Sequence, residues 1–321
     1  MPLVPSNYNP PHFFKNGHLS TMYAGLFREV NGLVQTRERI HLPDGDFLDL
    51  DWSYTNKPSK KVTILLHGLE GNAQRAYIQG SAKALTHNGH DVCAVNFRGC
   101  SGEPNTTYRS YHSGATEDLK AVLEHILEHE TYTEIYIKGF SLGGNLLLKY
   151  LGEGNVIPSE LKAAVAVSVP CRLDDSLHQL LSFKNIAYAA RFKKNLIEKL
   201  RSKQELFPLK IADSDIQKIK TLKDFDDVYT SKAHGFKDAM DYYTQCSARQ
   251  FLSGISVPSL IINAKNDSFL GKHCYPISEA ERSEQLYLEM PKYGGHVGFY
   301  GPDNLTYTER RTVSFFDEIA G

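Results

Sequence analysis

Short apolar runs alternate with longer amphipathic segments along most of the chain. The runs are typical of buried strands, and the segments between them, such as 73–87 and 115–130, have the periodicity of helices. Runs that are apolar on both faces indicate a parallel sheet covered on both sides, and strand–helix–strand alternation favours right-handed crossovers. The predicted strands of this type are 62–66, 91–96, 134–138, 163–169, 259–263 and 285–290.

The segments before residue 61 have a different pattern. Residues 36–42 and 47–54 are strand-like and flank an Asp44–Gly45 step, which strongly favours a hairpin turn. We therefore expect an antiparallel hairpin ahead of the parallel strands. Residues 1–30 are rich in proline, asparagine and aromatic residues, and we expect an arm that lies over the core and buries its apolar side chains. These side chains are Phe13, Phe14, Leu19, Met22, Tyr23, Leu26 and Phe27.

Between residues 170 and 257 the alternation stops and a mainly helical pattern appears. We interpret this segment as a lid inserted into the core. Basic residues dominate at 182–203, where a membrane-surface or lipid-facing role is one interpretation, although the solvated face of a packed helix is favoured. The prediction is an α/β protein whose mostly parallel sheet carries helices on both faces. Its parts are core 1–169, helical lid 170–257 and core 258–321.

Composition narrows the classes of partner. The 36 Lys and Arg residues balance 37 Asp and Glu residues, for a formal charge of -1. This balance argues against a nucleic-acid partner and favours a small organic substrate. The five cysteines include no Cys-x-x-Cys pair, so we expect reduced thiols in a cytoplasmic protein rather than disulfides or a zinc site. No stretch approaches the roughly 18 apolar residues of a membrane span. No glycine loop matches a nucleotide-binding motif, and we expect neither cofactor nor metal.

A candidate nucleophile lies in the pentapeptide Gly-Phe-Ser-Leu-Gly at 139–143, between the predicted strand 134–138 and a following helix. At such a strand-to-helix elbow the chain turns so sharply that the residues two before and two after the serine must be small. The turn also exposes the serine hydroxyl. We therefore expect Ser141 to be the nucleophile.

A serine hydroxyl needs a neutral imidazole to take its proton, and in this architecture the histidine comes last in the chain. His296 lies in a glycine-rich loop directly after the strand predicted at 285–290. Flanking glycines indicate a backbone shaped to deliver a side chain, so we expect His296 to be the base. His178, His234 and His273 are interpreted as surface loop histidines.

The imidazole in turn needs an acid. Asp267 follows the strand predicted at 259–263 through a short loop, and strand ends are where sites in such sheets gather. Asp174 and Asp175, one strand earlier, are the alternatives, and Asp267 is favoured over them. Asp303 and Asp317 follow His296 and fit the expected chain order poorly.

Acyl transfer also needs donors for the developing oxyanion. The Leu142 amide, directly after the nucleophile and at a helix N-terminus, is one candidate donor. The Leu69 amide, in the glycine-containing loop after the strand predicted at 62–66, is the second. His67 begins this loop and is expected to hold its shape through hydrogen bonds.

Two further polar motifs lie between the strand predicted at 91–96 and the helix predicted at 115–130. The segment 96–104 is interpreted as a turn that holds Arg98 in local hydrogen bonds, and the segment 111–114 as a cap for the next helix.

Taken together, these motifs are similar to those of the α/β-hydrolase superfamily, and within it the chain resembles the YheT-like branch, the AB hydrolase 4 family. The resemblance implies a serine carboxylesterase or monoacylglycerol-lipase-like hydrolase with Ser141, Asp267 and His296 as its triad. Relatives often have glutamine at Ser20 and a second aspartate at Asn266, and the asparagine removes one alternative acid. The supporting motifs are Asn16-Gly17-His18-Leu19, Arg37-Glu38, Leu42-Pro43-Asp44-Gly45, His67-Gly68-Leu69-Glu70-Gly71, Asn96-Phe97-Arg98-Gly99-Cys100-Ser101-Gly102, Tyr111-His112-Ser113-Gly114, Gly139-Phe140-Ser141-Leu142-Gly143-Gly144-Asn145 and Gly295-His296.

The sequence thus predicts an enzyme that cleaves carboxylic esters of short or medium acyl chains through an acyl-enzyme on Ser141. Acyl transfer or thioester cleavage by the same triad is one alternative. A binding module that keeps the pocket without turnover is another, because a fold does not fix a function.

Overall fold

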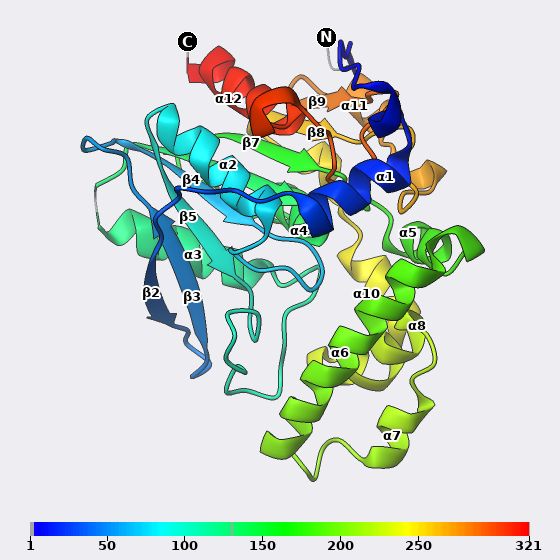
Figure 1. Ribbon diagram of the computed structural model, residues 1–321. Helices are drawn as coiled ribbons and strands as arrows, with labels where there is room; N and C mark the ends of the chain where they lie inside the picture. The colour runs from blue at the N-terminus through cyan, green and yellow to red at the C-terminus, as the bar shows by residue number, and fades with distance from the viewer. Residues whose placement is uncertain (1–2, 130, 321) are drawn as a thin grey trace.

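A nine-stranded sheet forms the centre of the computed structural model, which describes residues 3–129 and 131–320 (Figure 1). The strand order is β1-β9-β8-β7-β6-β4-β5-β3-β2. Neighbouring strands pair in parallel from β1 to β5, and β3 pairs antiparallel with both β5 and β2. The strands are β1 (Leu3–Val4), β2 (Thr36–His41), β3 (Phe47–Ser53), β4 (Lys61–Leu66), β5 (His90–Asn96), β6 (Glu134–Phe140), β7 (Leu161–Val167), β8 (Ser259–Ile262) and β9 (Leu286–Glu289).

Helices cover both faces of this sheet. On one face, α3 (Thr116–Glu128) and α4 (Leu142–Gly152) pack into the larger apolar cluster. On the other, α2 (Ala76–His87) and α12 (Tyr307–Ala320) pack into a second cluster with Phe140. The two clusters exist because side chains alternate across each strand and both sets are apolar. The predicted fold class, a mostly parallel sheet with helices on both faces, is confirmed.

The predicted hairpin is present as β2 and β3, but the Arg98 turn beside it differs from the prediction. Instead of local hydrogen bonds, the buried Arg98 guanidinium forms ion pairs with Asp118, Asp46 and Asp44 at 2.7–3.0 Å. A buried cation needs carboxylate partners, and these come from segments distant in the sequence. The turn therefore ties the hairpin to the start of α3.

Helices fill the segment between β7 and β8, where the sequence predicts an insertion. Its longest helix, α6 (Ile186–Leu206), packs on α8 (Leu222–Phe225) around an apolar cluster separate from the sheet. In Figure 1 these helices lie below the sheet on one side. The lid role of this segment stays a prediction. The other α-helices of this segment are α5 (Leu173–Leu180), α7 (Asp213–Lys218), α9 (Ser231–His234) and α10 (Ala239–Cys246), and α11 (Ile277–Glu281) lies between β8 and β9.

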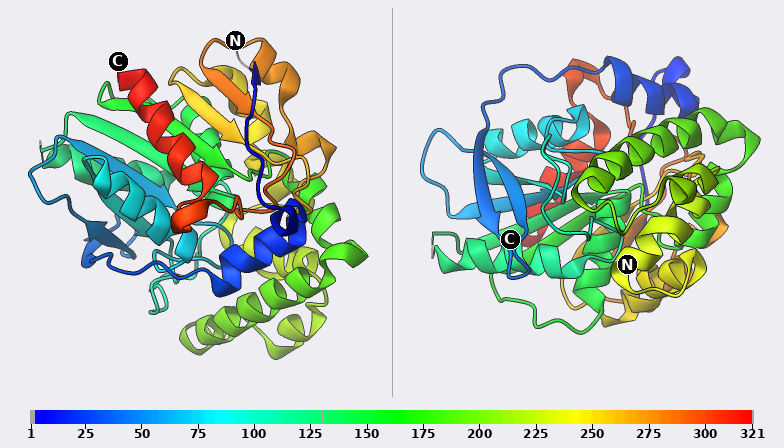
Figure 2. Two further views of the ribbon diagram at one scale, coloured as in Figure 1. Left: turned by 45° about the horizontal axis from the view of Figure 1, so that its top comes forward. Right: turned by 90° about the horizontal axis from the view of Figure 1, so that it is seen from below.

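The N-terminal arm runs beside the C-terminal part of the chain (Figure 2, left). Its strand β1 pairs with β9, and Phe14 stacks on Tyr300 with ring centroids 3.8 Å apart. The expectation that the arm buries all its apolar side chains is wrong. The arm forms a short 3-10 helix (His12–Lys15), the helix α1 (Gly17–Met22) and a π-helical turn (Tyr23–Phe27), so one side packs while the other faces outward. The exposed side chains are Phe13, Leu19, Met22, Leu26 and Phe27.

Two whole-chain observations complete the fold. The five cysteines are free and buried. Within the described ranges, no helix combines the length and the apolarity that crossing a bilayer requires.

Candidate active site

Ser141 lies at a strained turn between β6 and α4. Its backbone has φ 51° and ψ -116°, a region that residues other than glycine rarely adopt. The neighbouring glycines are required by close packing. A Cβ atom on Gly139 would lie 2.5 Å from the Gly143 carbonyl oxygen, and one on Gly143 would lie 2.5 Å from the His67 carbonyl oxygen. This is the crowding that the pentapeptide predicts, and it turns the half-buried Ser141 side chain toward the later loops.

The structure brings Ser141, His296 and Asp267 into one hydrogen-bonded chain. His296 Nε2 lies 3.0 Å from Ser141 Oγ, and His296 Nδ1 lies 2.9 Å from Asp267 Oδ2. Asp267 and His296 are buried, with exposed fractions of 4% and 7%. A carboxylate only accepts hydrogen bonds, so Nδ1 carries the proton and Nε2 is free to accept from the serine hydroxyl. This arrangement matches what a serine nucleophile needs.

Two contacts hold the Asp267–His296 pair in place. The second carboxylate oxygen, Asp267 Oδ1, accepts the Phe269 backbone N–H at 2.9 Å. The Phe269 ring stacks on the His296 imidazole with centroids 4.3 Å apart and an interplanar angle of 29°. No local pattern identifies Phe269, although it lies only two residues after the predicted acid.

The alternative acids have other partners. Asp174 pairs with Arg172 at 3.0 Å, and Asp175 Oδ2 accepts the His273 backbone N–H at 2.7 Å. His178 and His273 are exposed, as expected, but His178 lies within α5 rather than in a loop.

The surface-loop interpretation of His234 is wrong. This residue ends α9 and packs on His112 with ring centroids 4.3 Å apart. Burial lowers the pKa of His234 to about 2, so the ring is neutral at ordinary pH. Its place arises from the packing of α9 on the 111–114 segment, which no local pattern reveals.

The 111–114 segment does not cap α3. No side chain caps that helix, which begins after Ala115. Instead, Tyr111 reaches the loop after β4, where its hydroxyl accepts the Glu70 N–H at 2.9 Å and donates to Glu70 Oε1 at 2.7 Å. The Ser113 N–H donates to the Tyr242 hydroxyl at 3.0 Å. The segment therefore links the loop after β4 to the insertion.

The loop that carries Leu69 lies against the elbow. A Cβ atom on Gly68 would lie 3.2 Å from Ser141 Cβ. The Leu69 amide donates to no other residue in the described part of the chain, and the Leu142 amide belongs to the first turn of α4, whose N–H groups have no partner within the helix. Both candidate donors are therefore near Ser141 and available.

His67 holds this loop, as predicted. Its Nδ1 lies 2.7 Å from the Gly68 carbonyl oxygen and its Nε2 accepts the Phe97 N–H at 3.1 Å. Both contacts fit a neutral ring protonated on Nδ1. Burial lowers the pKa of His67 to about 3. His67 is thus a structural residue with both nitrogens occupied.

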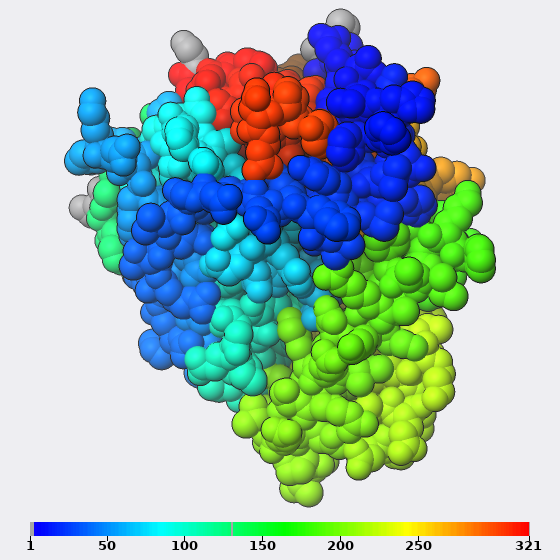
Figure 3. All heavy atoms as spheres, in the orientation of Figure 1, coloured from blue at the N-terminus to red at the C-terminus, as the bar shows by residue number. Residues whose placement is uncertain are grey.

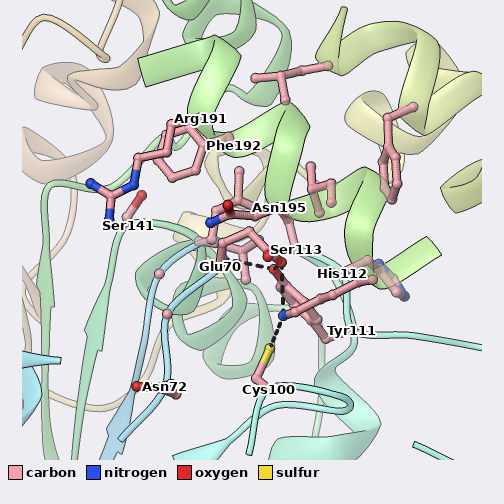
Figure 4. A pocket seen from close by; sticks show the side chains of 18 of the residues that line it. Glu70, Asn72, Cys100, Tyr111, His112, Ser113, Ser141, Arg191, Phe192 and Asn195 are labelled. Carbon is pink, nitrogen blue, oxygen red and sulfur yellow. Dashed lines mark hydrogen bonds and ion pairs between the residues drawn. The ribbon is translucent and has the colours of Figure 1, made fainter. Parts of the chain in front are cut away.

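A cavity of about 750 Å³ opens from Ser141 and His296 between the strand-end loops and the insertion. Figure 4 shows Arg191, Phe192 and Asn195 of α6 on the wall opposite the loops that carry Glu70 and Tyr111. The apolar wall of the cavity comes mainly from the helices of the insertion. Apolar lining residues there include Leu173, Leu177, Leu180, Phe192, Leu196, Leu200, Leu222 and Phe225.

One ion pair joins the two walls of the cavity. Lys199 Nζ of α6 lies 3.0 Å from the buried Glu70 Oε1 and 3.0 Å from Cys100 Sγ. The exposed fractions of the paired side chains are 37% for Lys199 and 4% for Glu70. The insertion is therefore bound directly to the residue that follows Leu69.

Within the described ranges, one group of side chains has the composition of a metal site. Ligand atoms of Glu38, His125 and His129 lie within 4.8 Å of one another. Both Glu38 oxygens already have partners, His125 Nε2 at 3.0 Å and Trp52 Nε1 at 2.7 Å. The group lies beside the edge strand β2, four strands from β6, so it takes no part in the chemistry at Ser141.

A covered parallel sheet with a serine at its strand-to-helix elbow, and an acid and a histidine on later loops, defines a class of hydrolases. A family model described as the alpha/beta hydrolase fold matches residues 61–302. This chain belongs to that family, and the resemblance inferred from its motifs is confirmed.

Individual relatives agree with this assignment. The chain is 37% identical to the Escherichia coli (strain K12) protein YheT, provisionally named an esterase, over 92% of this chain and 88% of that protein. It is 31% identical to phospholipase ABHD3 of Bos taurus, over 96% of this chain and 78% of the relative. The solved structure of the Pyrococcus furiosus esterase Pf2001 has a TM-score of 0.59 at 18% identity, covering 90% of this chain and 94% of that one. The chain is thus an esterase- or lipase-type hydrolase by family.

Proposed function

We propose that this protein is a serine hydrolase that cleaves carboxylic esters of short or medium acyl chains. The observation that carries the proposal is the hydrogen-bonded chain from Ser141 through His296 to Asp267, with the imidazole in the tautomer that accepts from the serine. Esterase and phospholipase names among the relatives support ester cleavage as the reaction class.

In the proposed mechanism, His296 Nε2 takes the proton of Ser141 as Oγ attacks the ester carbonyl carbon. Asp267 holds the imidazole in orientation and stabilises the imidazolium that forms. The amides of Leu69 and Leu142 donate to the oxyanion, where preorganised donors contribute strongly because they need no reorganisation. His296 then protonates the leaving alcohol, and a water molecule activated by the same imidazole releases the acid from Ser141.

The cavity supports a small or medium ester as the substrate class. Its volume of about 750 Å³ lies in the range typical of small-molecule sites, about 300–1,000 Å³. The apolar wall from α5, α6 and α8 suits an acyl chain, while the alcohol part of the ester would face the polar loops that carry Glu70 and Asn72.

Substitution of the nucleophile tests the mechanism. We expect Ser141→Ala to lower kcat on a p-nitrophenyl butyrate substrate by about 10⁴-fold or more, with its KM and circular dichroism spectrum close to those of the parent protein. A fluorophosphonate probe should label the parent protein and leave the variant unlabelled. Ser278→Ala, which removes a serine outside the cavity lining, serves as the control and should keep both activities. Ester cleavage that persists in Ser141→Ala would contradict the proposal.

A further inference from the structure

The loop that carries His296 is fixed by three side chains from three distant segments. The backbone N–H groups of three successive residues each donate to a different side-chain oxygen. The first acceptor follows β8, the second belongs to the N-terminal arm and the third follows β7. The bonds run from Gly295 N to Asn266 Oδ1 (3.0 Å), from His296 N to Thr21 Oγ1 (2.8 Å) and from Val297 N to Ser168 Oγ (3.0 Å).

This loop requires such support because its backbone is unusual. Gly295, Val297 and Phe299 have φ of 61°, 54° and 41°. Left-handed conformations at branched or bulky residues are costly and persist only where the surroundings determine them. Without its three acceptors, the loop would have less strained conformations available, and in these the imidazole would no longer face Ser141.

Thr21 is the one acceptor of the three that comes from the N-terminal arm. Its hydroxyl donates to the Gly17 carbonyl oxygen at 2.7 Å, which orients the oxygen lone pairs toward His296 N–H. The arm and the loop also touch through backbone. A Cβ atom on Gly295 would lie 2.2 Å from the Gly17 carbonyl oxygen. The contact is therefore too close for any side chain to intervene.

Asn266 joins the same assembly from the acid side. Its Oδ1 accepts the Gly295 N–H, while its Nδ2 donates to the Lys15 carbonyl oxygen at 3.0 Å. Asn266 directly precedes Asp267 in the chain. The arm segment 15–21 is thus bonded to the loop of the acid through Asn266 and to the loop of the base through Thr21.

We propose that the arm segment 15–21 is a working part of the active site, and that Thr21 is a positioning residue for His296. This inference rests on the proposed function. Thr21 acts through the backbone of the base, more than 250 positions away in the chain, and its hydroxyl bonds to His296 and Gly17 rather than to Ser141 or Asp267. Thr21 also lines the cavity, so the comparison of kcat with KM separates its positioning role from substrate contact. Its removal should therefore slow the proton transfers at His296 while leaving substrate binding largely unchanged.

The test compares three substitutions. Thr21→Val keeps the shape and removes the hydroxyl, and Thr21→Ser keeps the hydroxyl. Thr244→Val is the matched control, because the Thr244 hydroxyl also donates to the carbonyl oxygen four residues earlier, Met240, at 2.8 Å but lies exposed on α10. We expect Thr21→Val to lower kcat by about 10–100-fold, since misplacement of a catalytic group by about 1 Å costs on that order. KM should stay within about threefold in all three variants, and Thr21→Ser and Thr244→Val should keep the parent kcat.

A second measurement separates positioning from unfolding. The rate of fluorophosphonate labelling at Ser141 should fall in Thr21→Val in parallel with kcat, at a temperature where the variant is folded by circular dichroism. If valine prevents folding, Thr21→Ala removes the hydroxyl without placing a methyl group against two polar atoms, and it should show the same loss.

The outcomes distinguish this inference from the proposed function. If Ser141→Ala abolishes ester cleavage but Thr21→Val and Thr21→Ala keep the parent kcat and labelling rate, the positioning role is wrong and the hydrolase proposal stands. A loss confined to KM, or an equal loss in Thr21→Ser, also overturns the positioning role. If Ser141→Ala remains active, the proposed function itself fails.

Discussion

At the scale of single residues, the candidate site combines a strained nucleophile with a base whose ring nitrogens and backbone N–H all have partners. Ser141 has a backbone conformation that costs about 1–3 kcal/mol and persists because the glycines around it pack tightly. His296 has its ring bonded at both nitrogens and its backbone N–H bonded to Thr21. The chemistry thus depends on orientation at each of these atoms.

Substitution of Asp267 tests whether this residue is the acid that acts on His296. In Asp267→Asn, a neutral amide replaces the carboxylate that fixes the His296 tautomer and stabilises its imidazolium. We expect kcat to fall by about 10³–10⁴-fold in ester hydrolysis assays. Asp175→Asn is the matched control, because Asp175 bonds the His273 backbone instead, and it should stay within a fewfold of the parent protein. The reverse pattern, with Asp175→Asn inactive and Asp267→Asn active, would assign the acid to the earlier strand.

At the scale of elements, β6 carries a fully buried lysine just before the elbow. Lys138 is fully buried, and its Nζ lies 3.1 Å from both Ser81 Oγ and the Thr308 carbonyl oxygen. A neutral amine has two N–H groups, which these two acceptors satisfy. Burial lowers the pKa of Lys138 to about 7, against an opposing contribution from the Glu309 carboxylate, which itself pairs with Arg28. The sequence pattern predicts an apolar strand and does not indicate that Lys138 is neutral.

A pH dependence of stability follows from Lys138. Between about pH 7 and pH 10 the unfolded chain binds a proton that the folded chain has lost, so the free energy of unfolding should rise with pH by up to about 1.4 kcal/mol per unit. Below the folded pKa both states hold the proton and the full cost of the buried charge remains. Urea unfolding at pH 7, 8 and 9 should show this rise in the parent protein and lose it in Lys138→Met. Lys162→Met, on β7 with its amine exposed, should keep the rise. Equal slopes in all three proteins would refute the assignment.

Element order was predictable because local patterns determine it. Strands β4 to β9 are mostly apolar, and each lies within a few residues of its predicted bounds. Ser141, Asp267 and His296 follow from chain order and strand ends. By contrast, Thr21, Ser168 and Phe269 act through contacts that only the folded chain creates. The hydroxyl of Thr21 has no local signature that distinguishes it from Thr244, and the partners of Arg98 are carboxylates from separate segments.

At the scale of the whole molecule, the cavity is shared between two parts of the chain. The core supplies Ser141, Asp267 and His296, and the insertion supplies the apolar wall. In the space-filling view, the dark blue arm and the green insertion lie side by side on one face (Figure 3). They meet where His18 stacks on Tyr188 with centroids 5.8 Å apart. Substitutions in the core should therefore change the rate of the reaction, and substitutions in the insertion should change the preference among acyl chains.

A change of chain-length preference is the corresponding prediction. Leu177 of α5 lines the cavity and is half-buried, so Leu177→Trp should shorten the space available to the acyl chain. We expect kcat/KM for p-nitrophenyl octanoate to fall by about 10-fold or more relative to the acetate ester, since one methylene in an apolar pocket is worth roughly 1–3 kcal/mol. Leu181→Trp, at an exposed position outside the cavity lining, should leave the ratio unchanged. An unchanged ratio in Leu177→Trp would place the acyl chain elsewhere.

The pairing of β1 with β9 and the hydrogen bond from the His296 N–H to Thr21 Oγ1 join segments that are far apart in the sequence. During synthesis the arm leaves the ribosome long before its partners are made, and contacts of such long sequence separation form late in folding. A nascent chain in which the turn at Ser141 has formed still lacks Asp267, His296 and the hydrogen bond from His296 to Thr21. With the proposed mechanism, the protein would therefore become reactive only late in folding, after its C-terminal segments have packed against the arm.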